Sequence, residues 1–345
     1  MKKLAIFNLR TDPTSSVLGA SMDWIEAFRE HFNVTDVVST HVGKSAHLEG
    51  IQILEIGGGS IGARLVALKR LYNFAFHLIL NNRDYFVFHH MSPRTAVFPG
   101  VLFKLFGVPQ GLWYSHSSKP LALRLSPYIV DWVFSSETNS LPLRVQNSHF
   151  VGHGISLKRF DASQLITKRE RAVLFVGRIS RIKNLTYLIN ELASSSEMIP
   201  ITLIGPQSDE SYVKELRALA SKLGVSLTIK DPISYDEVNL IMKKFKYFYS
   251  GMNNSVDKSA LEAAISGCLV LTTDLGTQEL SGMKKVWDVT ASKEITSIQN
   301  QIKLLESLEE KELITFQELV RNESTRQNSL EKTISKISSI MKENT

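Results

Sequence analysis

Val173–Asn184, with the sequence VLFVGRISRIKN, is the stretch that decides the fold. Its first residues form a short apolar run that ends at Gly177, as in a buried strand followed by a turn. A basic loop follows, and a helix is expected to begin near Asn184. The loop carries three cations, Arg178, Arg181 and Lys183. Cations at the carboxyl end of a parallel strand, beside a helix N-terminus, bind phosphate, so the stretch predicts a phosphate site on an α/β sheet.

A second stretch, Ser255–Asp274 (SVDKSALEAAISGCLVLTTD), adds an acidic group in a similar setting. It predicts a short helix that carries Glu262 and ends at Gly267, followed by a buried strand at Cys268–Thr272. A carboxylate in this place can accept hydrogen bonds from hydroxyl groups. The alternative is an acid in a first helical turn, where the helix dipole favours negative charge without any ligand. A diphosphate with a sugar-like attachment would need both the cations and the carboxylate.

Along the rest of the chain, short apolar runs alternate with helical patterns. The expected strands are residues 2–7, 34–38, 51–55, 85–89, 110–114, 132–135, 148–152, 172–176, 201–204, 226–229, 247–249 and 268–272. Apolar strands between helices indicate parallel sheets that are covered on both faces. The alternation stops at the polar stretch 161–171 (DASQLITKRER), the expected linker, and then restarts. The sequence therefore predicts an α/β protein with two doubly wound, Rossmann-like domains that face one another across a cleft.

Composition is typical of a soluble globular protein, with 43% hydrophobic and 21% charged residues over 345 positions. No apolar run approaches the length of a membrane span, and the short apolar start after Met1 does not fit a signal peptide. The single cysteine, Cys268, lies in an apolar strand pattern and fits a reducing compartment. We therefore expect a cytoplasmic location.

Positive charge is concentrated in the first half of the chain. Residues 1–166 hold 16 Lys/Arg and 11 Asp/Glu, a net charge of +5, out of +6 for the whole chain. This favours an anionic surface or an anionic acceptor as the partner of the first domain, whereas the dispersal of the cations disfavours nucleic-acid binding. Apolar residues accompany the cations in Ile61–Leu80, Val101–Phe106 and Leu121–Leu125. These segments are either helices buried against the sheet or a basic, apolar face that rests on an anionic bilayer, which would be the inner face of the cell membrane.

Taken together, the two quoted stretches resemble the donor half of retaining GT-B glycosyltransferases, and in particular family 4, the glycosyl transferases group 1. The family pattern is a strand, then G-R-hydrophobic-x-x-x-K-N/G, and later a Glu before A-x-x-x-G and another strand. The matching residues are Gly177, Arg178, Ile179, Lys183 and Asn184, and then Glu262, Ala263, Ala264 and Gly267. The resemblance implies a GT-B fold with domains at 1–165, which binds the acceptor, and 166–325, which binds a nucleotide-sugar. It also implies a C-terminal helix, 326–345, that packs back on the first domain.

The resemblance further implies roles for single residues. Arg178 and Lys183 would hold the donor diphosphate and offset the charge on the leaving group, and Glu262 would bind the ribose. His116 ends a strand and is similar to the family histidine that faces the reacting sugar, so it joins the two cations as a catalytic candidate. The remaining donor-binding candidates lie in loops: Gly19, Gly205, Ile233, Asn254, Asp257 and Lys258.

One position departs from the family pattern. Many relatives have another Glu where this chain has Asn254, which can form hydrogen bonds but carries no charge. The substitution alters the sugar pocket and leaves open whether activity is changed or lost. Asp257 and Lys258 follow; Asp257 is either a donor contact or the N-cap of the next helix. His89 and His90 end another strand, where one of them would line the acceptor side.

The sequence therefore predicts a glycosyltransferase that moves a sugar from a nucleotide diphosphate donor, a UDP- or GDP-sugar, to a hydroxyl of a glycan or lipid-linked saccharide. Retention of configuration and a role in surface polysaccharide or glycoconjugate biosynthesis come from the resemblance. No metal site and no separate cofactor are expected, because no D-x-D loop, cysteine pair or H-E-x-x-H motif is present. Two alternatives remain open: a nucleotide-sugar epimerase of the same fold, and a catalytically degenerate GT-B subunit that only binds.

Overall fold

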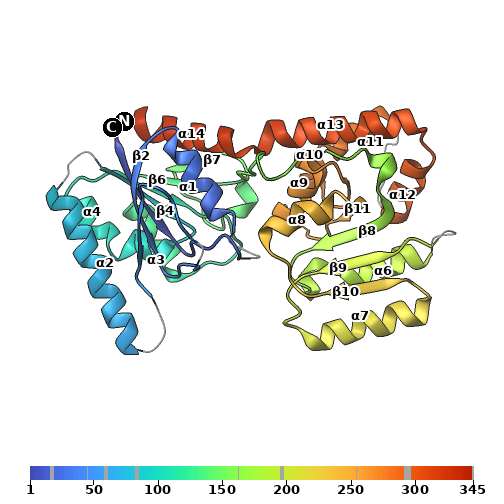
Figure 1. The fold of residues 1–345 in the computed structure, drawn as a ribbon, viewed down its shortest axis with the longest axis horizontal. Coiled ribbons are helices and arrows are strands. Elements are labelled where there is room, and N and C mark those ends of the chain that lie inside the picture. The colour runs from blue at the N-terminus through green and yellow to red at the C-terminus, as the bar shows by residue number, and fades with distance from the viewer. Residues whose placement is uncertain are drawn as a thin grey trace. The chain divides into compact units, whose positions relative to one another are not determined.

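The structure is a computed structural model, which describes residues 1–15, 19–44, 46–57, 61–81, 85–161, 163–194, 198–253, 255–290 and 297–343. The chain forms two compact units (Figure 1). The first unit consists of Met1–Gly154 together with Leu330–Thr345, and the second of Ile155–Ser329. Each unit is described by itself below.

The first unit is built on a seven-stranded sheet with the order β3-β2-β1-β4-β5-β6-β7, in which every pairing is parallel. Its strands are β1 (Lys3–Asn8), β2 (Asn33–Ser39), β3 (Gln52–Glu55), β4 (Tyr85–His90), β5 (Gln110–Trp113), β6 (Trp132–Ser135) and β7 (Ser148–Phe150). The central strands are buried on both faces, which explains their nearly continuous apolar sequences.

Helices cover both faces of this sheet, and the alternation of side chains along β4 shows which helix covers which face. Phe86 and Phe88 pack with the helices α1 (Ser21–Arg29) and α14 (Leu330–Glu343). Tyr85 and Val87 point the other way, toward the remaining helices. These are α2 (Ile61–Asn81), α3 (Pro93–Val97), α4 (Gly100–Leu105) and α5 (Leu121–Leu125), with the short turns η1 (Ser126–Tyr128) and η2 (Thr138–Ser140).

The second unit contains a five-stranded parallel sheet with the order β10-β9-β8-β11-β12. Its strands are β8 (Glu170–Val176), β9 (Ile201–Ile204), β10 (Leu227–Lys230), β11 (Phe245–Tyr249) and β12 (Leu269–Leu271). Its helical elements are η3 (Ile166–Lys168), η4 (Arg181–Lys183), α6 (Leu185–Ala193), α7 (Glu210–Leu223), α8 (Tyr235–Met242), α9 (Lys258–Ile265), α10 (Leu275–Ser281), α11 (Met283–Val289), α12 (Ile298–Glu306) and α13 (Glu310–Asn328). Both units are therefore parallel α/β sheets, as the alternation of the sequence predicts.

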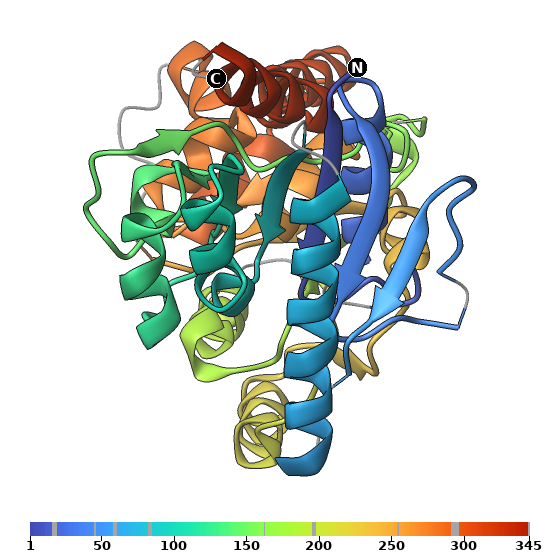
Figure 2. The ribbon, with the colours of Figure 1, turned by 90° about the vertical axis from the view of Figure 1, so that its left-hand side faces the viewer.

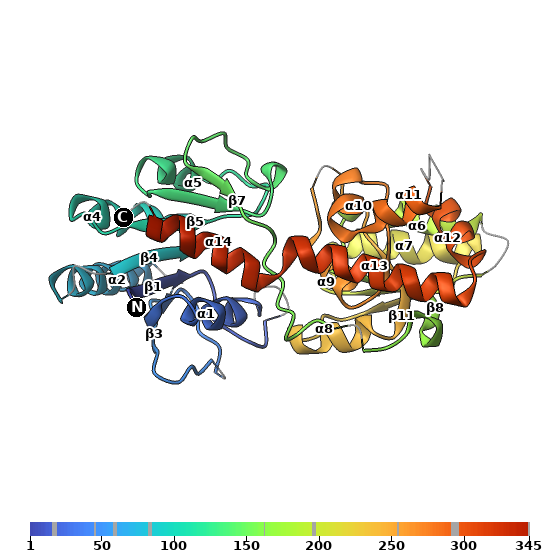
Figure 3. The same ribbon diagram turned by 90° about the horizontal axis from the view of Figure 1, so that it is seen from above.

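The C-terminal helix belongs to the first unit. Leu330, Ile334 and Ile337 are buried in the same apolar cluster as Trp24 and Phe28 of α1. Figure 3 shows α14 lying along this sheet beside α1. The predicted boundaries were at 165/166 and 325/326, whereas the units of the structure meet at 154/155 and 329/330.

The polar stretch 161–171, expected to be a linker, is built into the second unit. Arg169 is only 6% exposed. Its guanidinium donates to the carbonyl of Ser266 at 2.6 Å and to that of Gln164 at 2.9 Å. Glu170 already begins β8. The polar composition misled the prediction at Arg169, because buried carbonyl groups rather than solvent accept the hydrogen bonds of its guanidinium.

Candidate functional site

Most of the residues predicted to bind the donor lie at one edge of the second sheet. Because its strands are all parallel, their carboxyl ends meet at this edge, and predicted residues follow four of the strands. Arg178 and Lys183 follow β8, and Gly205 follows β9; Ile233 follows β10, and Asp257, Lys258 and Glu262 follow β11. In the strand order, β8 lies between β9 and β11, which is where the chain reverses direction through the sheet. Ligands of open α/β sheets bind at such a switch point, in the crevice beyond the strand ends.

Two glycines bring the loops after β8 and β9 into contact. A Cβ atom added to Gly205 would lie 2.0 Å from the carbonyl oxygen of Gly177. No side chain can be accommodated at that distance, so Gly205 is required for the backbones to approach. The predicted strand-end glycine therefore shapes the floor of the edge rather than supplying a side chain.

Arg178 is exposed at this edge, and in the described part of the chain it makes no hydrogen bond or ion pair. The next residue, Ile179, is fully buried, and its N–H donates to the Pro206 carbonyl at 3.0 Å. The backbone is thus anchored beneath a side chain that is available to a ligand. Arg181 differs, because it pairs with Glu215 of α7 at 2.7 Å and lies over the ring of Tyr212.

Lys183 forms an ion pair with Asp257, which the sequence predicts to be either a donor contact or a helix N-cap. Its Nζ lies 2.5 Å from Oδ2 of Asp257, and the two side chains are only 15% and 16% exposed. Asp257 stands at the N-cap position of α9, but its side chain makes no capping hydrogen bond. The ion pair therefore ties the loop after β8 to the start of α9. Nothing local in the sequence reveals it, since the partners are 74 residues apart.

The side chain of Glu262 is buried, and one of its two carboxylate oxygens already has partners within the protein. Its Oε1 accepts a hydrogen bond from the Tyr235 hydroxyl at 2.6 Å and lies 3.3 Å from Nζ of Lys258. Among the described residues, Oε2 has no such partner. Sequence reasoning missed Tyr235, although the capping box of Ser234 and Glu237 marks the start of its helix and could have placed it.

The helix after the basic loop differs from the expectation. The first amides of α6, those of Leu185 and Thr186, donate to the hydroxyl of Tyr212 at 3.0 and 3.3 Å. Asn184, just before them, has the left-handed backbone with φ 51°. These amides were expected to face phosphate, but the hydroxyl of Tyr212 accepts their hydrogen bonds, so they are not available to a phosphate group.

Two predicted residues lie in the first unit. His116 is exposed beyond the carboxyl end of β5, and its Nδ1 accepts a hydrogen bond from the Ser118 N–H at 3.0 Å. A neutral ring in this setting carries its proton on Nε2. Gly19 uses its own N–H within its loop, donating to the Ser15 carbonyl at 3.0 Å. Asn254 lies outside the described residues.

The paired histidines at the end of β4 are buried. His89 is fully buried between Thr95 and Gln110, and this burial lowers the pKa of its ring to about 3. His90 lies 3.1 Å from the Asn8 side chain and packs against the ring of Trp24. His89 is therefore a structural residue of the core, while His90 is 8% exposed at the strand end.

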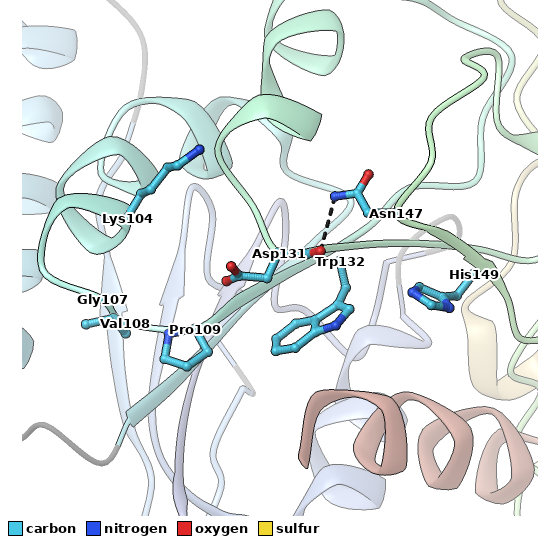
Figure 4. A pocket seen from close by; sticks show the side chains of 8 residues that line it. All are labelled: Lys104, Gly107, Val108, Pro109, Asp131, Trp132, Asn147 and His149. Carbon is cyan, nitrogen blue, oxygen red and sulfur yellow. Dashed lines mark hydrogen bonds between the residues drawn. The ribbon is translucent and has the colours of Figure 1, made fainter. Parts of the chain in front are cut away.

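A cavity of ≈ 470 Å³ opens at the opposite edge of the first sheet, before β5, β6 and β7 begin (Figure 4). Its lining residues are Lys104, Gly107, Val108, Pro109, Asp131, Trp132, Asn147 and His149. Burial raises the pKa of Asp131 and lowers that of His149. No residue predicted for the site lines it, so this cavity and the predicted site are separate.

No group of three or more His, Cys, Asp or Glu side chains within the described residues could hold a metal ion. Within the same residues, no helix combines the length and the apolar character that crossing a membrane requires.

Comparison with known proteins finds a family that resembles the part of the chain that holds the site. Residues 170–306 match the family described as Glycosyl transferases group 1. No curated protein matches the sequence. Among solved structures, HepE of Anabaena in complex with UDP-glucose superposes with a TM-score of 0.73 at 13% identity, covering 99% of this chain and 100% of that chain.

Other solved structures have the same architecture. Sucrose-phosphate synthase of Thermosynechococcus elongatus has a TM-score of 0.73 at 12% identity and covers 100% of this chain and 99% of that chain. The lipopolysaccharide outer core galactosyltransferase WaaB has a TM-score of 0.66 at 15% identity, with 99% of each chain covered. The predicted fold class is thereby confirmed: the chain has two parallel α/β domains with the GT-B architecture of these structures. Within it, residues 170–306 match the family of group 1 glycosyltransferases.

Proposed function

We propose that this chain, with its group 1 domain at 170–306, transfers a sugar from a nucleoside diphosphate donor to a hydroxyl of a glycan or lipid-linked saccharide. One observation carries the proposal. Arg178, Lys183 and Glu262 come from the two strands that flank the switch point of the second sheet, β8 and β11, and lie at the same edge. Two cations and a carboxylate in this place match a diphosphate and a neighbouring ribose.

The donor occupies this edge as follows. Arg178 and Lys183 bind the diphosphate oxygens, and Glu262 accepts hydrogen bonds from the ribose hydroxyls. The loop at Ile233 borders the base through its backbone, and Gly205 allows the nucleotide to approach the strand ends. HepE binds UDP and UDP-glucose, so a UDP-sugar is the first donor to test and a GDP-sugar the second. The nucleotide-sugar is a co-substrate, and the proposal includes no separate cofactor.

Transfer rests on electrostatic stabilisation of the leaving group. The bond from the anomeric carbon to the diphosphate breaks, and the diphosphate leaves with the electron pair. Arg178 and Lys183 stabilise the negative charge that develops there. The acceptor oxygen then bonds to the anomeric carbon with retention of configuration, and its proton passes to an oxygen of the departing diphosphate. These two cations supply the charge compensation that a divalent ion provides in other transferases, so the reaction is proposed to be independent of metal.

His116 is the catalytic candidate of the first unit. Its Nδ1 is occupied by the Ser118 amide, so Nε2 is the ring atom that donates a hydrogen bond to a hydroxyl of the reacting sugar. Asp257, Lys258 and Asn254 are assigned to the sugar side of the donor. The acceptor belongs to surface polysaccharide or glycoconjugate biosynthesis at the cytoplasmic face of the membrane.

The decisive experiment is a panel of UDP-, GDP- and ADP-sugars, with nucleotide release followed in the presence and absence of membrane lipid extract. Release that depends on the extract, together with a glycosylated product, supports the proposal. An altered sugar that stays on its nucleotide would identify an epimerase instead. Binding of a nucleotide-sugar without release or conversion would show a degenerate subunit.

A further inference from the structure

The helices α2, α3, α4 and α5 lie side by side on one face of the first sheet. Val87 of β4 packs with α2 and α4, and Leu112 and Val133 of β5 and β6 pack with α3 and α5. The neighbouring residues Phe88, Trp113 and Phe134 point to the opposite face, which α1 and α14 cover. The four helices therefore share one outer surface.

The helix α2 is apolar on both its inner and its outer side. Ala67, Leu71, Ala75 and Leu78 are buried against the sheet. On the outer side, Leu65 is 65% exposed, Phe76 is 43% exposed and Leu80 is 79% exposed. Lys69 and Arg70 are exposed among them. Figure 2 shows α2 standing at the front of the first unit with its full length uncovered. A helix that only covered a sheet would present polar residues outward.

Exposed apolar residues are also present on α4, η1 and α5. Their exposed large hydrophobic residues are Val101, Leu105, Phe106, Leu121, Leu125 and Tyr128. Side chains join these elements to one another: the Tyr72 hydroxyl of α2 donates to the Phe98 carbonyl at 2.9 Å, and Lys104 of α4 donates to the Tyr128 carbonyl. We call this continuous region, from Leu65 to Tyr128 over the four helices and η1, the outer surface.

The charge of the outer surface has one sign. Residues 61–130 contain eight Lys or Arg and a single acid, Asp84. Twelve of the 22 exposed large hydrophobic side chains in the described part of the chain also fall in this range. Apolar groups that are mixed with cations and nearly free of acids match the chemistry of an anionic bilayer, where acyl chains lie under negative headgroups.

We propose that the outer surface binds a bilayer that contains anionic lipids, with Leu65, Phe76 and Leu80 of α2 inserted among the headgroups and Lys69 and Arg70 on the lipid phosphates. A second copy of the chain is a poorer occupant, because a twofold contact would set this basic surface against itself.

The outer surface also adjoins the carboxyl edge of the first sheet. Leu121, at the start of α5, follows the loop that carries His116. A bilayer held there would present a lipid-linked acceptor to His116; this last step rests on the proposed function, whereas the binding of lipid does not.

The test is co-sedimentation of the purified chain with vesicles, without any donor sugar. Vesicles of phosphatidylcholine and phosphatidylglycerol are compared with vesicles of phosphatidylcholine alone, from about 0.1 M to about 1 M salt. The expected result is binding to the anionic vesicles that weakens with salt. The variant Lys69→Glu with Arg70→Glu should lower the partition coefficient at least about tenfold. The variant Leu65→Ser with Phe76→Ser should lower it as well, because the apolar contacts are lost while the charge is kept.

The matched control reverses two exposed cations of the second unit, Lys214→Glu with Arg217→Glu on α7, which changes the net charge equally. The proposal would be overturned if the two charge-reversal variants lost vesicle binding equally. It would also be overturned if the unsubstituted chain bound neither kind of vesicle. A concentration-dependent dimer that Lys69→Glu with Arg70→Glu abolishes, without lipid binding, would also overturn it in favour of a second copy. Arg178→Ala should bind vesicles normally, so lipid binding and sugar transfer can fail independently.

Discussion

The two units share one construction, a parallel sheet between helices, but they present their charges differently. In the second unit, charges of both signs meet: Arg181 pairs with Glu215, and Glu306 receives both Lys246 and Arg171. Lys183 and Asp257 form another such ion pair beyond the carboxyl ends of the strands. In the first unit, residues 61–130 are almost without acids.

The strand ends differ in the same way. At the carboxyl edge of the first sheet, Asn8, His90 and Trp24 form a polar and aromatic cluster. At the corresponding edge of the second sheet lie two basic side chains, Arg178 and Lys183, and the acid Glu262. The contrast fits the two kinds of recognition proposed above: a compact polar site for a charged small molecule in the second unit, and an extended apolar and basic surface in the first. Four predictions test this contrast.

The largest effect is expected from Arg178→Ala, which should lower turnover about 10²- to 10³-fold, because a charge that stabilises the leaving group is lost. Arg181→Ala is the matched control, since this side chain is committed to α7. Steady-state nucleotide release measures both, and circular dichroism checks the fold. Near-normal turnover in Arg178→Ala would refute its role in the second unit's site.

Ile337→Ala should destabilise the first unit by about 3 kcal/mol, because it opens a cavity in a fully buried cluster. The second unit should keep its stability. Amide hydrogen exchange under native conditions measures the stability of each unit separately: the protection of β1 and β4 should decrease, whereas that of β8 and β11 should not change. Leu240→Ala, at a residue that is 60% exposed, serves as the control. Uniform loss of protection in both units would show that they unfold together.

His89 should make the first unit acid-sensitive. Burial holds its pKa at about 3 in the folded chain, whereas the unfolded ring titrates near its usual value of about 6.5. The unfolded state therefore binds more protons below this value, so the contribution is fully present at neutral pH and is lost as the pH falls toward 3. At pH 5 the loss is about 2 kcal/mol.

Replacing the ring by His89→Gln should flatten the decline in urea stability between pH 7 and pH 5, whatever its effect at pH 7. An unaltered pH dependence in His89→Gln would contradict this assignment.

The smallest effect is expected from Asp257→Asn. The acid competes with a diphosphate for Lys183, so its neutralisation should tighten the binding of free UDP about fivefold, or about 1 kcal/mol. Glu215→Gln removes the analogous partner of Arg181 and should leave UDP binding unchanged. Isothermal titration calorimetry measures both. Weaker UDP binding in Asp257→Asn would show that the acid supports the nucleotide rather than competing with it.

The sequence was a good guide wherever the information is local. The apolar run before Gly177, the cations that follow it and the position of Glu262 on a short helix are all as predicted. Hydrophobic periodicity and turn residues depend on neighbours along the chain, so they can be recognised without a structure. The same holds for the composition of α2, although the sequence left open whether its apolar residues are buried; the structure shows that both situations occur on this one helix.

Partners that are distant in the chain could not be predicted. Tyr212 caps α6, Tyr235 holds Glu262, Asp257 neutralises Lys183, and Arg169 is buried in a stretch that reads as a linker. By itself, the sequence determined the alternation of strands and helices, the residues at the strand ends and the unequal distribution of charge. Only the tertiary structure decided which of those residues meet, because the order of strands in a sheet, not the order in the chain, sets which side chains come within hydrogen-bonding distance.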